Sequence, residues 1–392
     1  MENTSVKISA VTEPVTRRRA APASSSVFTG TQIKRDGPVA QETFHTMLTL
    51  ERRRAERSRK PFVLMLIDAH GLPESKKTEN FLRKLPSVVS NSTRETDIVG
   101  WYKQGVILGV IFTEVTVEAQ RNITDVLSSK VIAVLNEELD RELLSNLIVT
   151  VHLFPESWNP QDSEPIADIK LYPDLAHRES KRRLPLAVKR AIDVLGSTAL
   201  LFVLSPILLV IVLAIKLTSK GPVIFEQERL GHLGTRFKCL KFRTMYVNND
   251  PKIHQEYVQR FIAGQAESGN AGSGVYKITS DPRVTPVGRI LRKLSFDELP
   301  QFWNVLRGEM SLVGPRPPVP YEFEVYDIWH RRRVLELKPG VTGLWQVCGR
   351  SRTRFEEMVR LDLKYSQSWS LWLDIKILAA TPRAVLTGDG AY

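Results

Sequence analysis

Residues 194–215 read VLGSTALLFVLSPILLVIVLAI, and this stretch decides how the rest of the chain is divided. None of its 22 side chains carries a charge. A straight helix of that length would be roughly 33 Å long, which is about the hydrocarbon thickness of a bilayer. Pro206 follows Ser205 near the middle and cannot donate a backbone hydrogen bond, so we expect the helix to break at Ser205 and Pro206.

Basic side chains flank this apolar stretch on both sides. They are Arg182, Arg183, Lys189 and Arg190 before it and Lys216, Lys220 and Arg229 after it. Because basic residues next to a membrane segment favour the cytoplasmic side, both ends are drawn to the same face. A re-entrant membrane helix over residues 186–220, which enters the bilayer, breaks and returns, satisfies both ends. A single full span is the alternative.

The residues before the membrane segment fall into three parts. Residues 1–40 include TRRRAAPASSS, show no apolar core of the signal-peptide type and are expected to form a flexible tail. Residues 41–154 alternate apolar runs with helical patterns and predict a small folded domain. Residues 155–185 carry several prolines among polar residues, which is typical of a linker.

The N-terminal domain is predicted to follow a βαββαβ order. This order describes a small α+β sandwich. The expected elements are a strand at 61–69, a helix at 78–92, a hairpin at 97–114, a helix at 117–135 and a strand at 146–155. Asp68, Asp97 and the GWYKQG turn at 100–105 make the domain similar to a degenerate nucleotide-cyclase-like domain of the GGDEF type. WYKQG stands where the signature loop of an active cyclase would be, so we expect a regulatory or dimerisation domain.

Composition sets the broad class of the protein. The 392 residues predict two domains, and 55 basic against 43 acidic residues give a net charge of +12 with a pI near 9.6. Such a surface favours phosphate-bearing partners: nucleic acid, anionic lipid or nucleotide substrates. Two cysteines far apart, without metal-ligand spacing, predict neither a disulfide framework nor a zinc site.

Residues 221–392 hold the candidate chemistry, beginning with a basic hairpin. Residues 221–245 predict a strand, a glycine turn and a second strand. Lys241 and Arg243 are two residues apart and therefore share one face of an extended run.

Two adjacent acids, Asp297 and Glu298, stand in the motif SFDE. Ser295 and Glu298 have the spacing of a capping box, so a purely structural role at a helix start is one interpretation. Nearby arginines and lysines favour the other interpretation, in which an ionised Asp297 beside a phosphate site acts as a nucleophile on phosphorus. Adjacent acids and phosphate oxygens are also ligands that magnesium prefers.

Prolines in GPRPP (314–318) surround Arg316 and restrict its backbone. A guanidinium held in this way suits bidentate contact with phosphate, whereas a surface turn with a solvated arginine is the alternative. Arg350, at the end of KPGVTGLWQVCGR (338–350), is a further candidate for a phosphate contact, with a structural loop as the alternative.

From about Lys189 to the end, the chain strongly resembles the bacterial sugar transferase family, the monotopic polyprenyl-phosphate phosphoglycosyl transferases. The motifs that carry the resemblance are KRAIDVLGS, Ser205-Pro206, GPVIFEQERLG, FKCLKFRTM, the run from ITSDPRV to GPRPPVP, KPGVTGLWQVCGR and LDLKYSQSWSLWLDIKIL. The resemblance implies transfer of a sugar-1-phosphate from a UDP-sugar to polyprenyl (undecaprenyl) phosphate with release of UMP. It also implies a Mg²⁺ cofactor, inner-membrane lipids as partners and a location on the cytoplasmic face of the bacterial inner membrane.

The same resemblance implies roles for individual residues. Asp297 would be the nucleophile that forms a covalent phosphosugar intermediate, and Glu298 would assist by holding magnesium. The residues expected around the phosphates are Arg292, Arg316 and Arg350, with Lys241 and Arg243 on a basic strand nearby. Trp369, Trp372 and Ile375 near the C-terminus predict an interfacial amphipathic helix, with a buried core helix as the alternative.

Two other classes of protein are alternatives to this enzyme. A membrane-tethered protein that senses a nucleotide would not need the acid pair and the arginines. A nucleic-acid binder is disfavoured because the basic residues are dispersed and tied to an apolar run. The sequence leaves open which sugar is transferred, which polysaccharide pathway uses it, and whether the protein forms a homodimer.

Overall fold

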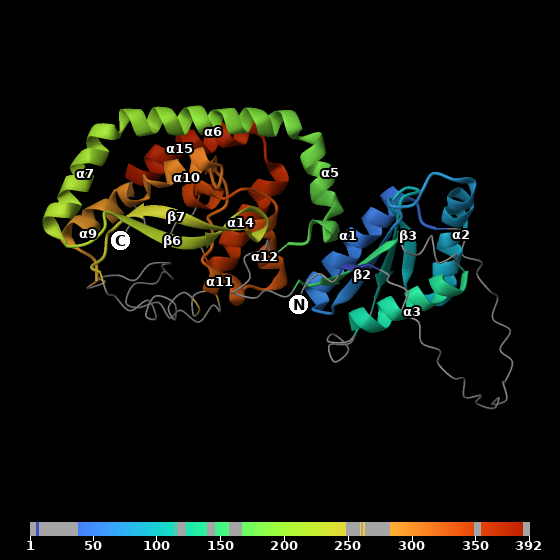
Figure 1. Ribbon diagram of the computed structural model, residues 1–392. Helices are drawn as coiled ribbons and strands as arrows, with labels where there is room; N and C mark the ends of the chain where they lie inside the picture. The colour runs from blue at the N-terminus through green and yellow to red at the C-terminus, as the bar shows by residue number, and fades with distance from the viewer. Residues whose placement is uncertain are drawn as a thin grey trace. The chain divides into compact units, whose positions relative to one another are not determined.

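The computed structural model describes residues 5–7, 38–113, 115, 123–138, 146–156, 167–247, 259, 262, 283–348 and 354–386. The chain divides into two compact units, residues 1–157 with 170–174 and residues 158–169 with 175–392 (Figure 1). Helices and strands are mixed in both units, as the α+β prediction requires.

The N-terminal unit is built on an antiparallel sheet in the order β1-β5-β2-β4-β3. Between β2 and β5 the elements follow the predicted βαββαβ order, and every predicted strand and helix is found there. Residues 5–7, within the range expected to be a tail, pair with β5 as β1. The strands are β1 (Ser5–Lys7), β2 (Phe62–Asp68), β3 (Ile98–Lys103), β4 (Ile107–Phe112) and β5 (Ile148–Phe154).

Helices cover both faces of this sheet. Helices α2 (Lys76–Ser92) and α3 (Ile123–Glu138) pack on the face that buries Val99, Leu108 and Val110. On the opposite face lies α1 (Gln41–Ser58), whose Phe44 occupies the space over Gly100 and Gly109. A Cβ at Gly109 would come within 2.5 Å of the Phe44 ring, so the two glycines let α1 approach the strands closely.

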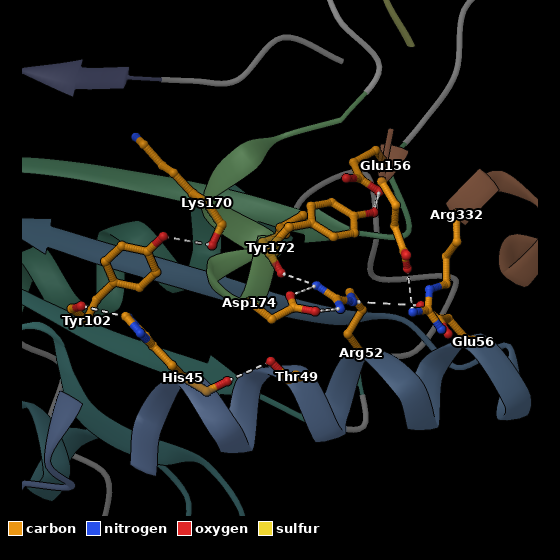
Figure 2. Close-up of polar contacts among 12 residues, drawn as sticks. His45, Thr49, Arg52, Glu56, Tyr102, Glu156, Lys170, Tyr172, Asp174 and Arg332 are labelled. Carbon is orange, nitrogen blue, oxygen red and sulfur yellow. Dashed lines mark hydrogen bonds and ion pairs between the residues drawn. The ribbon is translucent and has the colours of Figure 1, made fainter. Parts of the chain in front are cut away.

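Arg52 fastens α1 to residues 171–174 (Figure 2). Its buried guanidinium donates to both carboxylate oxygens of Asp174, at 2.9 and 3.0 Å, and to the carbonyl of Leu171. It also lies over the Tyr172 ring, 4.4 Å from the centroid. Burial raises the pKa of Tyr172 well above its ordinary value; Glu156 raises it further, and Arg52 acts to lower it. Part of the predicted linker is therefore ordered, as the short helix η2 (Ile169–Leu171) and α5 (Pro173–Lys181).

The apolar stretch forms two helices that meet at a 62° bend. Helix α6 (Arg183–Val203) ends before Leu204, and α7 (Ser205–Thr218) begins with Ser205 and Pro206 in its first turn. Within the described residues, no single helix has the length and hydropathy to cross a bilayer, and the pair α6–α7 is the one bent combination that does. Eight large apolar side chains on the pair are more than half exposed, namely Leu184, Leu195, Phe202, Val203, Leu209, Val210, Leu213 and Leu217.

The first half of α6 presents a polar face to the rest of its unit. Asp193 is buried and accepts bonds from Ser311 Oγ and the Leu312 backbone. Arg190 donates to the carbonyls of Val305 and Leu306, and Lys189 forms a 2.7 Å ion pair with Asp374. These contacts seat α6 along α10 and α15, as Figure 1 shows.

Beneath α6, a hairpin and a set of short helices form the rest of this unit. The antiparallel hairpin joins β6 (Ile224–Leu230) to β7 (Arg236–Phe242), as predicted. Strands β8 (Ser311–Val313) and β9 (Gly340–Thr342) form a short parallel pair. The remaining elements are η3 (His232–Gly234), α9 (Pro286–Lys293), η4 (Phe296–Glu298), α10 (Gln301–Arg307), α11 (Pro320–Glu324), α12 (Ile328–Leu335), α13 (Leu344–Cys348), α14 (Phe355–Ser368) and α15 (Leu371–Leu386).

The C-terminal aromatic residues divide between core and surface. Trp372 and Ile375 on α15 are 63% and 47% exposed, as an interfacial helix requires. Trp369, which the interfacial interpretation also included, is buried, and its indole N–H donates to Asp374. The prediction for Trp369 was wrong because the chain turns between α14 and α15 and directs this ring into the core with Tyr365 and Ile377.

Candidate active site

The candidate acid pair lies against the second strand of the hairpin. Lys241 near the end of β7 extends to η4, and its Nζ lies 2.9 Å from Oε1 of Glu298. The two side chains are 17% and 27% exposed, so the ion pair is partly shielded from water. Asp297 precedes Glu298 in the same 3₁₀ turn and is also partly exposed. The structure therefore brings together three of the predicted site residues.

The capping-box prediction was wrong. Ser295 has a left-handed backbone, with φ of 57°, and its side chain makes no cap hydrogen bond. The acids lie in η4, one short turn before α10, rather than in the first turn of a long helix. The carboxylate of Glu298 bonds to Lys241 instead of turning back to the backbone of Ser295. Glu298 therefore acts as the ion-pair partner of Lys241 and does not cap a helix together with Ser295.

Asn304 holds the helix after the acid pair against β7. Its side chain is fully buried; Nδ2 donates to the Lys238 carbonyl at 2.7 Å, and Oδ1 accepts from the Leu240 backbone at 3.0 Å. Nδ2 also donates to Glu309. The amide therefore bonds to β7 as a neighbouring strand would, and it fixes α10 beside the residue that precedes Lys241.

The loop that carries Arg316 lies next to the first strand of the hairpin. The backbone of Leu230 and the guanidinium of Arg229 donate to the carbonyls of Pro318 and Pro317. Burial raises the pKa of the Cys239 thiol, and Lys241, Arg229, Glu298 and Arg316 all act electrostatically on the same thiol. The Arg316 loop and the acid pair therefore both bond to the hairpin, the loop at the end of β6 and the acid pair at Lys241 of β7.

Arg292 and Arg243 are held near the C-terminal end of β7. Arg292 Nε donates to Thr244 Oγ1 at 2.9 Å. Arg243 is buried, and its guanidinium donates to the carbonyls of Ser219 and Lys220 at the end of α7. Lys241 and Arg243, expected on one face, thus reach different partners. Arg350 lies outside the described residues.

A metal site at the acid pair was tested against the donors present. Among the described residues, no group of three or more His, Cys, Asp or Glu side chains could hold an ion. Magnesium, however, is commonly held by one or two carboxylates together with substrate phosphates and water. Asp297 and Glu298 supply two adjacent carboxylates. The donor set therefore fits a magnesium ion that arrives with a phosphate-bearing substrate and does not fit a pre-formed protein cage.

Two residues that shape this site were not predicted as site residues from the sequence. Arg229 was read only as a basic flank of the membrane segment, although it shares a strand face with Gln227, which it contacts. Asn304 stands between Trp303 and Val305 in an apolar helix. A polar residue among apolar neighbours was the signal that could have found it, because buried amides need partners.

The unit that holds this site has the sequence of a transferase. Residues 184–388 match the family model described as "Bacterial sugar transferase". The match covers just over half of the chain. The protein therefore belongs to the bacterial sugar transferase family, and the family prediction is confirmed.

Relatives of known name match the same region. The chain is 42% identical to the exopolysaccharide production protein ExoY of Rhizobium meliloti, over 52% of this chain and 88% of that protein. It is 43% identical to the UDP-glucose:undecaprenyl-phosphate glucose-1-phosphate transferase of Caulobacter vibrioides, over 52% and 72% of the two chains. With the undecaprenyl-phosphate galactose phosphotransferase of Salmonella typhimurium the identity is 41%, over 57% of this chain and 44% of that protein.

A structural likeness was found to a solved DGC protein from Thermotoga maritima. It has 18% identity and a TM-score of 0.25 and covers 31% of this chain and 85% of that one.

Proposed function

We propose that the protein transfers a sugar-1-phosphate from a UDP-sugar to undecaprenyl phosphate and releases UMP. The observation that carries the proposal is the contact between Lys241 and Glu298, which seats the acid pair on the hairpin that also holds the Arg316 loop. A carboxylate beside fixed cations is suited to chemistry at phosphorus. The names of the Caulobacter and Salmonella relatives, which describe this type of reaction, support it.

In the first step, a carboxylate oxygen of Asp297 attacks the phosphorus atom that bears the sugar. A new O–P bond forms, and the bond from that phosphorus to the bridging oxygen of the donor breaks. The bridging oxygen leaves on UMP with its electron pair, so the step needs no oxidant, and the sugar-phosphate is held on Asp297. Arg316, and Arg292 and Arg350 with it, would balance the charge of the phosphates.

In the second step, an oxygen of undecaprenyl phosphate attacks the same phosphorus atom. The bond to Asp297 breaks, and its carboxylate is regenerated. Glu298, held by Lys241, would position the incoming phosphate. One anhydride is formed for each one broken, so the reaction depends on positioning and charge stabilisation rather than on a large driving force.

Asp297 and Glu298 would also hold magnesium together with the donor phosphates. When bound, the ion offsets the repulsion between the carboxylates and the phosphate oxygens. Lys241 contributes a cation to the same carboxylate pair from the protein itself.

The bent pair α6–α7 would place this site beside the lipid acceptor, as a re-entrant segment on the cytoplasmic face of the inner membrane. Its exposed apolar side chains would lie in the bilayer, while the polar face of α6 keeps the catalytic unit attached. The product would serve polysaccharide synthesis, and the N-terminal unit would regulate the enzyme or join two copies. The name of the Rhizobium relative supports a role in exopolysaccharide production.

The test uses membranes that contain the full chain, supplied with one UDP-sugar at a time and with undecaprenyl phosphate. UMP release with at least one donor is expected, together with its loss in Asp297→Asn and on chelation of magnesium. A donor labelled in the sugar and its phosphate should leave label on Asp297 when the acceptor is omitted. UMP release that continues unchanged in Asp297→Asn would overturn the assigned nucleophile.

A further inference from the structure

The loop around Arg316 has few backbone N–H groups of its own. Residues 315, 317 and 318 are prolines, which have no N–H to donate. The conformation of the loop therefore depends on donors that other elements supply to its carbonyl groups.

Four successive carbonyls of the loop receive such donors, beginning with that of Pro315, which accepts from the Gly340 backbone at 2.8 Å. The carbonyl of Arg316 accepts from Arg333 at 3.2 Å, that of Pro317 accepts from Arg229 at 2.6 Å, and that of Pro318 accepts from the Leu230 backbone at 2.9 Å. Both donating arginine side chains are almost fully buried, with residues 3% and 5% exposed. Donors on α12 and on β6 therefore both hydrogen-bond to the loop.

The two arginines differ in how their own charges are balanced. Arg333 forms a 2.6 Å ion pair with the buried Asp362, as expected for a guanidinium that serves the core. Arg229 has no ion pair with a carboxylate among the described residues, and its Nε and Nη2 instead donate to the neutral amide oxygen of Gln227. Gln227 holds the guanidinium plane, and Nη1 is thereby directed at the Pro317 carbonyl.

We propose that Arg229 is a positioning residue for Arg316. It acts through the Pro317 carbonyl, fixing the peptide next to Arg316 so that the Arg316 side chain is presented to the phosphates of the donor. The inference rests on the proposed function in one respect, that Arg316 contacts phosphate. Arg229 itself is held inside by Gln227 and the loop and touches no substrate in this scheme.

The test is a double-mutant cycle on the full-length protein in detergent. Arg229→Met keeps much of the apolar stem and removes every donor. We expect it to lower kcat/KM for the UDP-sugar roughly tenfold to a hundredfold, because misplacement of a binding group by about an ångström has effects of that size. Arg316→Met should cost at least as much, and the double variant should lose no more than Arg316→Met alone, since Arg229 acts through Arg316.

Two further variants separate positioning from general damage. Arg229→Lys retains one donor group and should recover part of the activity that Arg229→Met loses. Arg236→Met lies on the same hairpin, where the Arg236 side chain pairs with Glu228, and should leave kcat/KM within about twofold. If Arg229→Met fails to fold, as judged by its thermal melt, the cycle is carried out with Arg229→Lys and Arg316→Lys.

Binding of inorganic pyrophosphate, measured by calorimetry, provides a readout that needs no turnover. Weaker binding in Arg229→Met than in Arg236→Met, with no further loss in the double variant beyond Arg316→Met, supports the inference even if no UDP-sugar yields UMP. Losses that multiply in the double variant, or Arg229→Met binding like Arg236→Met, would overturn it. Absence of UMP release from the unaltered protein with every donor would overturn the proposed function alone.

Discussion

The ammonium group of Lys241 lies 2.9 Å from a carboxylate oxygen of Glu298, and this contact joins the basic hairpin to the turn that carries Asp297. The two residues are 57 positions apart in the chain. Their contact is maintained by Asn304, which fastens α10 to the backbone of β7 at Lys238 and Leu240. The acid pair is therefore positioned from both sides, by an ion pair before α10 and by a buried amide within it.

Lys241→Met is expected to impair activity much more than stability. A partly exposed ion pair contributes about 1 kcal/mol or less to folding, because water competes for both charges. Loss of the cation beside Glu298 should nevertheless lower UMP release at least about tenfold, since charge balance and positioning are lost together. Rates of UMP release and thermal melts of the same preparations measure the two effects. Lys238→Met, which removes an exposed lysine paired with Glu226 on the same strand, serves as the control and should retain its activity.

Asn304→Leu is expected to destabilise the catalytic unit by about 2–4 kcal/mol. The apolar side chain leaves the part-buried Leu240 N–H and Lys238 carbonyl without their partner, and each unsatisfied group costs about 1–3 kcal/mol. Denaturant unfolding followed by tryptophan fluorescence measures the loss. Asn304→Leu that unfolds at the same denaturant concentration as the unaltered protein would show that the amide does not hold α10 to β7.

Much of the fold follows from local patterns in the sequence. The strand at 62–68 and the hairpin at 98–112 were predicted because a short apolar run and a glycine turn are local signals. The position of the helix break follows as locally, from the proline that starts α7. Helix α1 was missed because its long charged stretch, which includes Arg52, Arg53 and Arg54, obscures the apolar face that carries Phe44 and Leu48.

The site could be predicted by residue type but not by partner. Asp297, Glu298 and Lys241 were identified from their chemistry, yet the Lys241–Glu298 contact depends on how a hairpin packs on a turn 57 residues later. Arg243 shows the limit of the strand-face argument, because its guanidinium bonds to the end of α7 although it lies only two residues from Lys241. No sequence period encodes contacts of this kind.

Both ends of the α6–α7 pair are expected on the same side of the membrane. In a Cys348→Ser background, which removes the exposed native thiol, cysteines placed at His177 and Lys220 should react with a membrane-impermeant maleimide from the same side of sealed inverted vesicles. Pro206→Ala restores the backbone N–H that proline lacks. It should therefore straighten the pair and make the thiol at 220 less accessible from that side. Reaction of the two thiols from opposite sides in the unaltered helix pair would instead establish a full span.

The buried pair of Arg333 and Asp362 should make stability depend on pH. Burial raises the pKa of Asp362 from 3.8 to about 7, although Arg333 acts to lower it. A carboxyl group whose pKa is higher in the folded protein binds more protons there than in the unfolded chain. Its contribution to stability is therefore fully present below pH 3.8 and is lost as the pH rises through about 7.

His330, on the same helix as Arg333, has the opposite effect, because burial lowers its pKa from 6.5 to about 4. Its contribution is present above pH 6.5 and is lost as the pH falls through about 4. The Asp362 effect is therefore measured as the difference between the unaltered protein and Asp362→Asn, in which His330 is common to both. Between about pH 4 and pH 7, the free energy of unfolding of the unaltered protein should fall relative to that of Asp362→Asn by up to about 1.4 kcal/mol per pH unit. Thermal melts at half-unit intervals follow the slope, and parallel stability curves for the two proteins over this window would show that Asp362 is ionised throughout as the partner of Arg333.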